Sequence, residues 1–221
     1  MRRKLLIGLG SAAVVAAGGL WFGRRGGQTG ALPALDIERV AASATDTQGV
    51  VDMALGAADA PVTVVEYASF TCPHCRRFHE EVFPQIRKNY IDTGKVRFIL
   101  REVYFDRYGL WAAMVARCDG GMRYFGMVDL IFDKQREWTQ GEPAEVAANL
   151  RKLGRLAGLS DEKLDACLQD GETAKALVAA YQTNAQRDGI EGTPTFIING
   201  EKYSNMGYED FARVLDEKLG A

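Results

Sequence analysis

Two apolar runs rich in β-branched residues stand out in the hydrophobic pattern, at residues 62–67 and 96–103. The first run lacks a clean alternation of apolar and polar positions, which is typical of a strand buried on both faces. Between the runs, Phe78, Val82 and Ile86 recur at helical spacing, so we expect a helix there. A strand, a helix and a second strand in this order predict that the two strands are parallel.

The second half of the chain begins with a long helical pattern and then returns to β-type residues. Apolar residues recur at helical spacing throughout residues 106–188, which predicts an all-helical segment. Residues 195–198 are expected to form a strand. Asn199-Gly200 follows and is a strong hairpin signal, so residues 201–203 should pair antiparallel to that strand. An amphipathic pattern over residues 208–219 predicts a closing helix.

Several single residues mark the expected ends of these elements. Pro84 lies inside the first predicted helix, which would otherwise run to about Tyr90, and it should kink or break that helix. Residues 50–55 are expected to form a first, short strand. Ser160 is suited to cap a helix, and Gly189 to end the last helix of the long helical segment.

The N-terminus has the layout of an export signal. Residues 1–4 are basic, and residues 5–22 carry no charge and are rich in Leu, Ala, Gly and Val. The uncharged run is also close to the ~20 residues that span a bilayer. We therefore interpret residues 1–23 as a signal peptide or an uncleaved membrane anchor, followed by a linker with a short helix over residues 24–50.

Composition narrows the function classes. Apolar residues make up 47% and charged residues 25% of the 221-residue chain, as in an ordinary globular protein. The formal net charge of -2 offers no basic footprint, so we do not expect a nucleic-acid partner. The four cysteines are too few for a disulfide scaffold in a chain of this length, and we expect one reactive pair and one further pair.

The candidate chemistry lies in Cys72-Pro73-His74-Cys75, between the first strand and the helix that follows it. A helix N-terminus offers unpaired N–H groups and the positive end of the dipole, which stabilise a thiolate nucleophile. Cys72 would be that nucleophile, and Cys75, one turn later, would point inward and resolve the mixed disulfide. A positive charge on His74 would further depress the Cys72 pKa and make the disulfide a better oxidant.

A zinc site is the alternative use of these cysteines. Two more ligands would be required, and the sequence has no second closely spaced cysteine pair. His79, the only other histidine, cannot complete a four-ligand set, and we interpret it as a packing or surface residue. No metal and no cofactor are expected.

The sequence resembles the DsbA-like family of exported thiol-disulfide oxidoreductases. The resemblance rests on residues 62–67, on Cys72-Pro73-His74-Cys75, and on Gly192-Thr193-Pro194-Thr195-Phe196. The expected fold class is α/β, a thioredoxin fold with a helical subdomain inserted between its βαβ half and its C-terminal ββα half. The thioredoxin-like domain would comprise residues 51–105 and 189–221, and the inserted helical subdomain residues 106–188.

The resemblance also implies roles for Glu66, Thr193 and Pro194. A carboxylate within an apolar strand is costly unless it works or is paired, and in the family an acidic residue here assists proton transfer at the buried cysteine. Glu66 would do so, or it is a strand-edge or ion-paired residue. Thr193-Pro194 matches the cis-proline signature, which would bring Pro194 against Cys72 and let the Thr193 backbone pair with a substrate peptide. The alternative is a proline that simply opens a strand.

Cys118 and Cys167 both fall in the helical segment. In an oxidising compartment we expect them to form a structural disulfide. A second redox pair, which would tune or relay, and two buried free thiols are the other interpretations.

The function hypothesis is a monomeric periplasmic oxidoreductase, either free or tethered to the inner membrane by an uncleaved N-terminal segment, that introduces disulfides into reduced exported proteins through Cys72 and Cys75. The resemblance implies a DsbB-like membrane quinone reductase as its reoxidant. A disulfide isomerase or reductase of the same fold is the first alternative. A metal-binding or chaperone module that uses the same cysteines and groove is the second.

Overall fold

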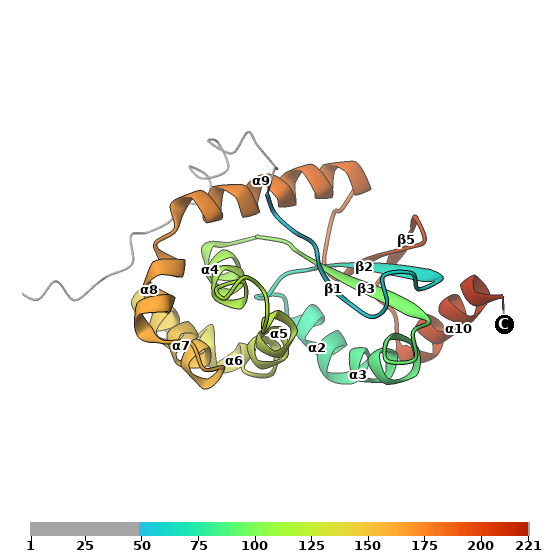
Figure 1. Cartoon of the computed structure of the whole chain (residues 1–221), viewed down its shortest axis with the longest axis horizontal. Coiled ribbons are helices and arrows are strands. Elements are labelled where there is room, and N and C mark those ends of the chain that lie inside the picture. The colour runs from blue at the N-terminus through green and yellow to red at the C-terminus, as the bar shows by residue number, and fades with distance from the viewer. Residues whose placement is uncertain (1–48, 221) are drawn as a thin grey trace, which may run out of the picture. The chain divides into compact units, whose positions relative to one another are not determined.

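The computed structural model describes residues 49–220, which belong to one compact unit. A five-stranded sheet crosses it in the order β1-β3-β2-β4-β5 (Figure 1). Only β2 and β3 run parallel, as the order of the first elements predicts, and the other neighbours are antiparallel. The strands are β1 (Met53–Leu55), β2 (Val62–Ala68), β3 (Val96–Glu102), β4 (Thr195–Ile198) and β5 (Glu201–Ser204).

The central strand β2 is buried on both faces, as its sequence predicts. Val62, Val64 and Ala68 face the larger core, whereas Val65 and Tyr67 face a smaller one. Because side chains alternate along a strand, Glu66 lies on the face of the larger core.

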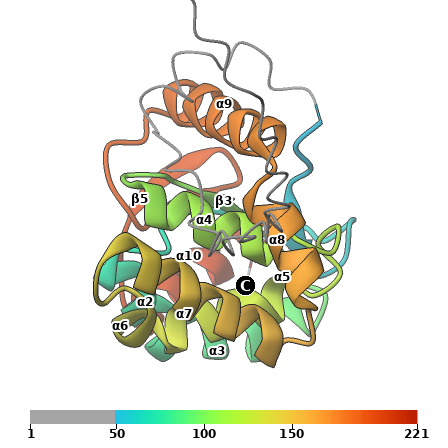
Figure 2. The same cartoon turned by 90° about the vertical axis from the view of Figure 1, so that its left-hand side faces the viewer.

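Helices cover both faces of the sheet (Figures 1 and 2). In Figure 1, α9 runs along one face, α2, α3 and α10 lie on the other, and the remaining helices gather beside one end of the sheet. The helices are α2 (Pro73–Glu81), α3 (Phe83–Ile86), η1 (Arg87–Ile91), α4 (Arg107–Ala116), α5 (Tyr124–Asp133), α6 (Gln135–Trp138), α7 (Pro143–Leu156), α8 (Asp161–Leu168), α9 (Gly171–Asp188) and α10 (Tyr208–Leu219).

The helical segment predicted over residues 106–188 contains only helices and their connections. Ser160 caps α8 by accepting a hydrogen bond from the Lys163 N–H at 3.2 Å, and Gly189 ends α9 in the left-handed conformation, with φ of 61°. Both caps agree with the sequence analysis. They show that these two helix ends follow from local capping chemistry.

The helix that follows Cys72 is broken at the point that Pro84 predicts. Helix α2 ends at Glu81, Val82 forms the cap, and α3 begins at Phe83 with the proline in its first turn. Proline has no N–H to donate to the preceding turn, so a continuous helix would lose a hydrogen bond here. The chain then widens into the π-helical segment η1 instead of continuing as one α-helix to Tyr90.

The hairpin at the end of the sheet also agrees with its sequence signal. Asn199 and Gly200 have φ of 45° and 87°, as a turn with two left-handed residues requires. Strand β5 extends to Ser204, one residue beyond the predicted strand, and the first strand, β1, is shorter than the predicted residues 50–55.

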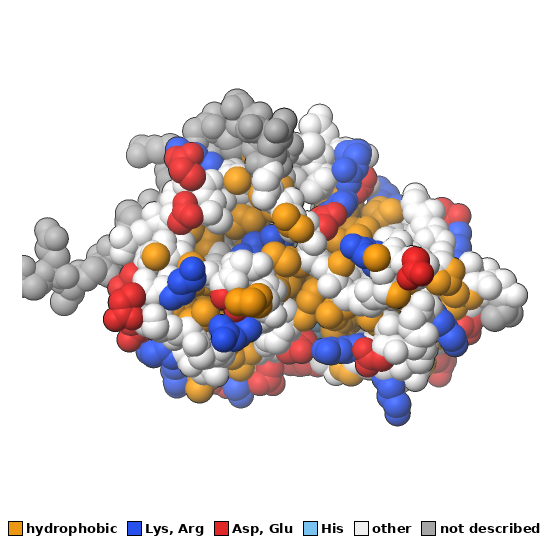
Figure 3. All heavy atoms as spheres, viewed as in Figure 1, with side chains coloured by type: hydrophobic (Ala, Val, Ile, Leu, Met, Phe, Trp, Pro, Cys, Tyr) orange, Lys and Arg blue, Asp and Glu red, His pale blue; other side chains and the backbone are white. Residues whose placement is uncertain are grey.

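The signal peptide or anchor expected over residues 1–23 lies outside the described residues, as does nearly all of the linker expected over residues 24–50. No helix within residues 49–220 has both the length and the apolar character needed to cross a bilayer. On the face drawn in Figure 3, acidic and basic side chains are interspersed and surround apolar ones.

Candidate active site

Cys72 and Cys75 lie at the start of α2, just beyond the C-terminal end of β2. Cys72 is the N-cap residue, Pro73 occupies the first helical position, and the first turn contains no acidic residue. Both thiols are free, but Cys72 is partly exposed while Cys75 has 0% exposure. A reagent in solvent therefore reaches Cys72 first, and Cys75 can react only with a group already bound to Cys72.

The pKa values of the two thiols move apart. The pKa of Cys72 falls from 9.0 to about 5, chiefly because the Cys75 thiol donates a hydrogen bond to its sulfur. Thr193 and the backbone N–H groups of Cys75 and His74 add to this effect, whereas partial burial opposes it. Burial raises the pKa of Cys75 far above its usual range, and its hydrogen bond with Cys72 and the charge of Glu66 act in the same direction. At neutral pH the pair is thus a Cys72 thiolate beside a Cys75 thiol.

The His74 side chain is exposed at the surface of α2. Its backbone N–H, rather than its imidazole, is the part of the residue that contributes to the lowered Cys72 pKa. Tuning of Cys72 by an imidazolium charge therefore stays a prediction.

The loop before β4 lies directly beside Cys72. The Thr193–Pro194 peptide bond is cis, and the carbonyl oxygen of Thr193 is 3.4 Å from the Cys72 sulfur. A surface groove of about 420 Å³ follows this loop. It is lined by Gly189, Glu191, Gly192, Thr193, Pro194, Thr195, Lys202 and Ser204. A peptide in the groove would have backbone groups of the chain available for pairing close to the reactive sulfur.

Glu66 lies under the site and is fully buried. In the register of the sheet it stands between Leu100 of β3 and Phe196 of β4, on the face that α2 covers. Its Oε2 is 2.8 Å from Nε2 of His79, one helical turn beyond Cys75. The hydrogen bond lowers the cost of burying the carboxyl. Glu66 is therefore a central, paired residue and not a strand-edge one.

His79 is a residue of the site that the sequence analysis did not include. It lies four residues after Cys75, so both side chains project from the same face of α2. Its side chain is 2% exposed and bonded to Glu66. The interpretation as a packing residue accounts for its burial but omits this contact, and a surface position is wrong. The spacing of four was the available signal.

Gln135 was also missed, and no sequence signal indicates it. It comes from the short helix α6, and its Nε2 donates to the carbonyl oxygens of Phe70, at 2.8 Å, and Cys72, at 3.0 Å. The residue is 5% exposed. Through these bonds the helical segment fixes the loop that presents Cys72.

Cys118 and Cys167 are joined by a disulfide that links the end of α4 to α8. Both residues lie in the helical segment, as expected from the sequence. Among residues 49–220, no three His, Cys, Asp or Glu side chains gather closely enough to hold a metal ion.

Fold and site together define a thioredoxin-fold protein with a reactive dithiol at a helix N-terminus. The family model described as "Thioredoxin" matches residues 48–217, more than half of the chain. A putative protein-disulfide oxidoreductase of Rickettsia typhi is 34% identical over 169 residues, which are 76% of this chain and 62% of that protein. Disulfide bond formation protein D of Bacillus subtilis is 30% identical over 175 residues, covering 75% of this chain and 76% of its own length.

Solved structures agree with these relatives. Wolbachia pipientis alpha-DsbA1 matches with a TM-score of 0.72 and 31% identity, over 76% of this chain and 91% of that one. Oxidised BdbD from Bacillus subtilis matches with a TM-score of 0.68 and 27% identity, over 77% and 94%. The chain belongs to the DsbA-like family, with a thioredoxin fold and a helical insertion. It spans less than two thirds of the length of the rickettsial relative above.

Proposed function

We propose that this chain is an exported thiol-disulfide oxidoreductase that donates the Cys72–Cys75 disulfide to reduced proteins. The observation that carries the proposal is the opposite behaviour of the two thiols: the Cys72 pKa is lowered to about 5, and Cys75 is buried with a raised pKa. A thiolate that is stable at neutral pH is a good leaving group, so the reduced form is favoured and the disulfide is a strong oxidant.

The reaction proceeds in two exchanges. A substrate thiolate attacks the Cys72 sulfur, the Cys72–Cys75 bond breaks, and Cys75 leaves with the electron pair and takes up a proton. A second substrate thiolate then attacks the substrate sulfur of the mixed disulfide, and Cys72 leaves as a thiolate. The substrate is oxidised by two electrons and the dithiol is reduced by two.

Four further residues would assist these exchanges. Thr193 and Pro194 would hold an extended substrate peptide by its backbone beside Cys72, which suits substrates of many sequences. Glu66 would exchange the proton of Cys75, since its charge already acts on that thiol. A positive charge on His74 would add to the stabilisation of the Cys72 thiolate.

The proposed setting is the periplasm, and the N-terminal residues 1–23 would direct the chain there, as a cleaved signal or as a tether to the inner membrane. A DsbB-like membrane quinone reductase would return the dithiol to the disulfide. The relatives of this chain are described as disulfide oxidoreductases and disulfide bond formation proteins, which supports an exchange role.

The oxidase function is tested by mixing the oxidised chain, in stoichiometric amount, with a reduced unfolded protein that has native disulfides. We expect the substrate thiols to disappear as the Cys72 thiol appears, with no such transfer by Cys72→Ser. The Cys75→Ser variant has no disulfide to donate, so it should also leave the reduced substrate unchanged. A chain that leaves the reduced substrate unchanged but rearranges a scrambled one would be an isomerase, and the oxidase proposal would be wrong.

A further inference from the structure

Glu66 and His79 form a buried pair that leaves one open atom at each end. The bond between them joins Oε2 of Glu66 to Nε2 of His79, at 2.8 Å. The other two atoms, Oε1 of Glu66 and Nδ1 of His79, are buried and have no hydrogen-bond partner among the described residues. Buried polar atoms are nearly always paired, so an open atom at each end calls for an explanation.

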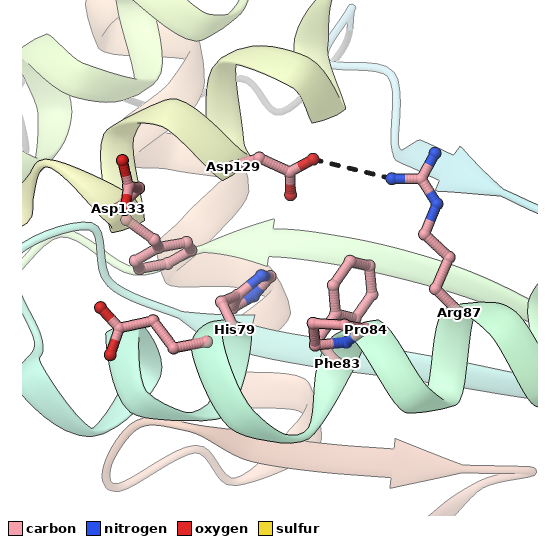
Figure 4. Close-up of a pocket in the computed structure, with 8 residues that line it drawn as sticks. His79, Phe83, Pro84, Arg87, Asp129 and Asp133 are labelled. Atoms are coloured by element: carbon pink, nitrogen blue, oxygen red, sulfur yellow. Dashed lines mark ion pairs between the residues drawn. The ribbon is translucent and has the colours of Figure 1, made fainter.

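A pocket of about 400 Å³, lined by residues of α2, α3, η1 and α5, reaches the histidine (Figure 4). The imidazole forms part of its wall, stacked on Phe132 with 4.3 Å between ring centroids, while Phe83 packs at 4.8 Å. In Figure 4 the ring of His79 lies between α2 and Asp129 of α5. The imidazole thus lines a surface pocket, although its Nδ1 atom is itself buried.

The mouth of the pocket carries charged groups from three elements. Arg87 approaches Asp129 to 3.6 Å, and the Asp129 side chain is 49% exposed. Burial raises the pKa of Asp129, and the charges of His79 and Arg87 act in the opposite direction. The charged groups around the imidazole are Glu66 from β2, Glu80 from α2, Arg87 from η1, and Asp129 and Asp133 from α5.

Cys75 needs a proton path that its own surroundings do not supply. The thiol is fully buried, yet its sulfur must gain a proton when the disulfide opens and lose one when it attacks a mixed disulfide. In the proposed function Glu66, whose charge acts on this thiol, exchanges that proton, but Glu66 too has 0% exposure. A further group must connect Glu66 with solvent.

We propose that His79 is this connection, a positioning residue that relays protons between Glu66 and solvent in the pocket of Figure 4. The inference rests on the proposed function of the dithiol and deepens it. When Cys75 leaves as a thiolate, it takes the proton of the Glu66 carboxyl. The carboxylate then takes the Nε2 proton of His79, and Nδ1 takes one from solvent. One proton moves from solvent to sulfur, and the path runs in reverse when Cys75 attacks.

The relay is tested on the step in which Cys75 attacks a preformed mixed disulfide between Cys72 and glutathione. The variant His79→Phe keeps a ring between Phe83 and Phe132 but removes both nitrogens. We expect the rate of this step to fall on the order of 100-fold near neutral pH. The remaining rate should increase with pH, because hydroxide must now remove the proton. The initial attack of Cys72 on oxidised glutathione should change less than twofold.

Glu80→Gln is the matched control, because it alters the same pocket without touching the pair. It should leave the rate and its pH profile unchanged. A His79→Phe chain that resolves the mixed disulfide within threefold of the unaltered rate, with the same pH profile, would overturn the relay. If that variant does not melt cooperatively, His79→Gln takes its place and the same two outcomes apply.

This result is separable from the oxidase proposal. A potential as low as that of thioredoxin would remove the oxidase function but leave the relay intact, because Cys75 must exchange its proton in either direction of the reaction. Conversely, if the relay is overturned, the dithiol can still have an oxidising reduction potential, and the oxidase proposal stands.

Discussion

At the scale of single residues, the reactivity of the site depends on two sulfur atoms one helical turn apart. Cys72 occupies the N-cap position of α2 and accepts a hydrogen bond from the Cys75 thiol, whereas Cys75 is enclosed by the core. The same chemical group therefore acts as a thiolate in one position and as a thiol in the other. The asymmetry arises chiefly from the hydrogen bond between the two thiols and from the burial of Cys75.

The lowered Cys72 pKa predicts how the stability of the reduced protein depends on pH. Its folded-state pKa of about 5 lies below the ordinary value of 9.0, so the stabilisation is fully present above pH 9 and is lost as pH falls through 5. Urea unfolding of the reduced protein from pH 4 to pH 9 measures this. Cys72→Ser should lack this part of the pH dependence, and an identical pH dependence in both proteins would contradict the lowered pKa.

The loop that presents Cys72 predicts a role for Gln135. Replacing Gln135 by Ala removes two hydrogen bonds to backbone carbonyl groups, of which that of Phe70 is buried, so we expect a loss of about 1–3 kcal/mol in the free energy of unfolding. Chemical denaturation measures the loss. Gln140→Ala, at an exposed position two residues beyond the end of α6, is the control and should change stability by less than about 0.5 kcal/mol.

At the scale of elements, the packing of α7 against α8 depends on a missing side chain. A Cβ at Gly154 would lie 2.4 Å from Cδ2 of Leu164, which is fully buried. In an exposed helix, Gly→Ala stabilises by about 1 kcal/mol. At this position the methyl group must displace Leu164 within a packed core, so the substitution is expected to destabilise the protein instead.

Two glycine variants test this directly by thermal or urea denaturation. Gly154→Ala should lower the free energy of unfolding by about 1–3 kcal/mol. Gly126→Ala in α5 meets nothing within 4 Å and should be neutral or stabilising by up to about 1 kcal/mol. Equal and stabilising effects at both positions would show that the close approach of Leu164 is not a constraint.

The elements themselves were largely predictable from the sequence, because their signals are local. The continuous apolar character of β2, the Asn199-Gly200 turn and the break before Pro84 each follow from a few neighbouring residues. The thiol pair was predictable for the same reason, since two cysteines separated by two residues at a helix start indicate a redox site by themselves.

The contact between Glu66 and His79 and the position of Gln135 were not predictable in this way. That His79 meets Glu66 depends on how α2 lies across β2, and no local pattern states this. Gln135 reaches Cys72 from 63 positions further along the chain, from a four-residue helix without a distinctive pattern. Such contacts arise from tertiary packing of segments that are separate in sequence.

At the scale of the whole molecule, the helical segment is tied together by the disulfide between Cys118 and Cys167, 49 positions apart. Closing a loop of this length restricts the unfolded chain, so the double variant Cys118→Ala, Cys167→Ala should be less stable by about 2–4 kcal/mol. Denaturation without reductant measures this. The Cys72 pKa, followed by thiolate absorbance, is expected to stay near 5, and an unchanged stability would contradict a structural role for the disulfide.

The central claim is that stabilisation of the Cys72 thiolate makes the Cys72–Cys75 disulfide a strong oxidant. It is tested most directly by equilibrating the protein with glutathione buffers and following alkylation of Cys72 to obtain the reduction potential. The account predicts a reduction potential similar to that of DsbA, about −120 mV. A value near the about −270 mV of thioredoxin would contradict it.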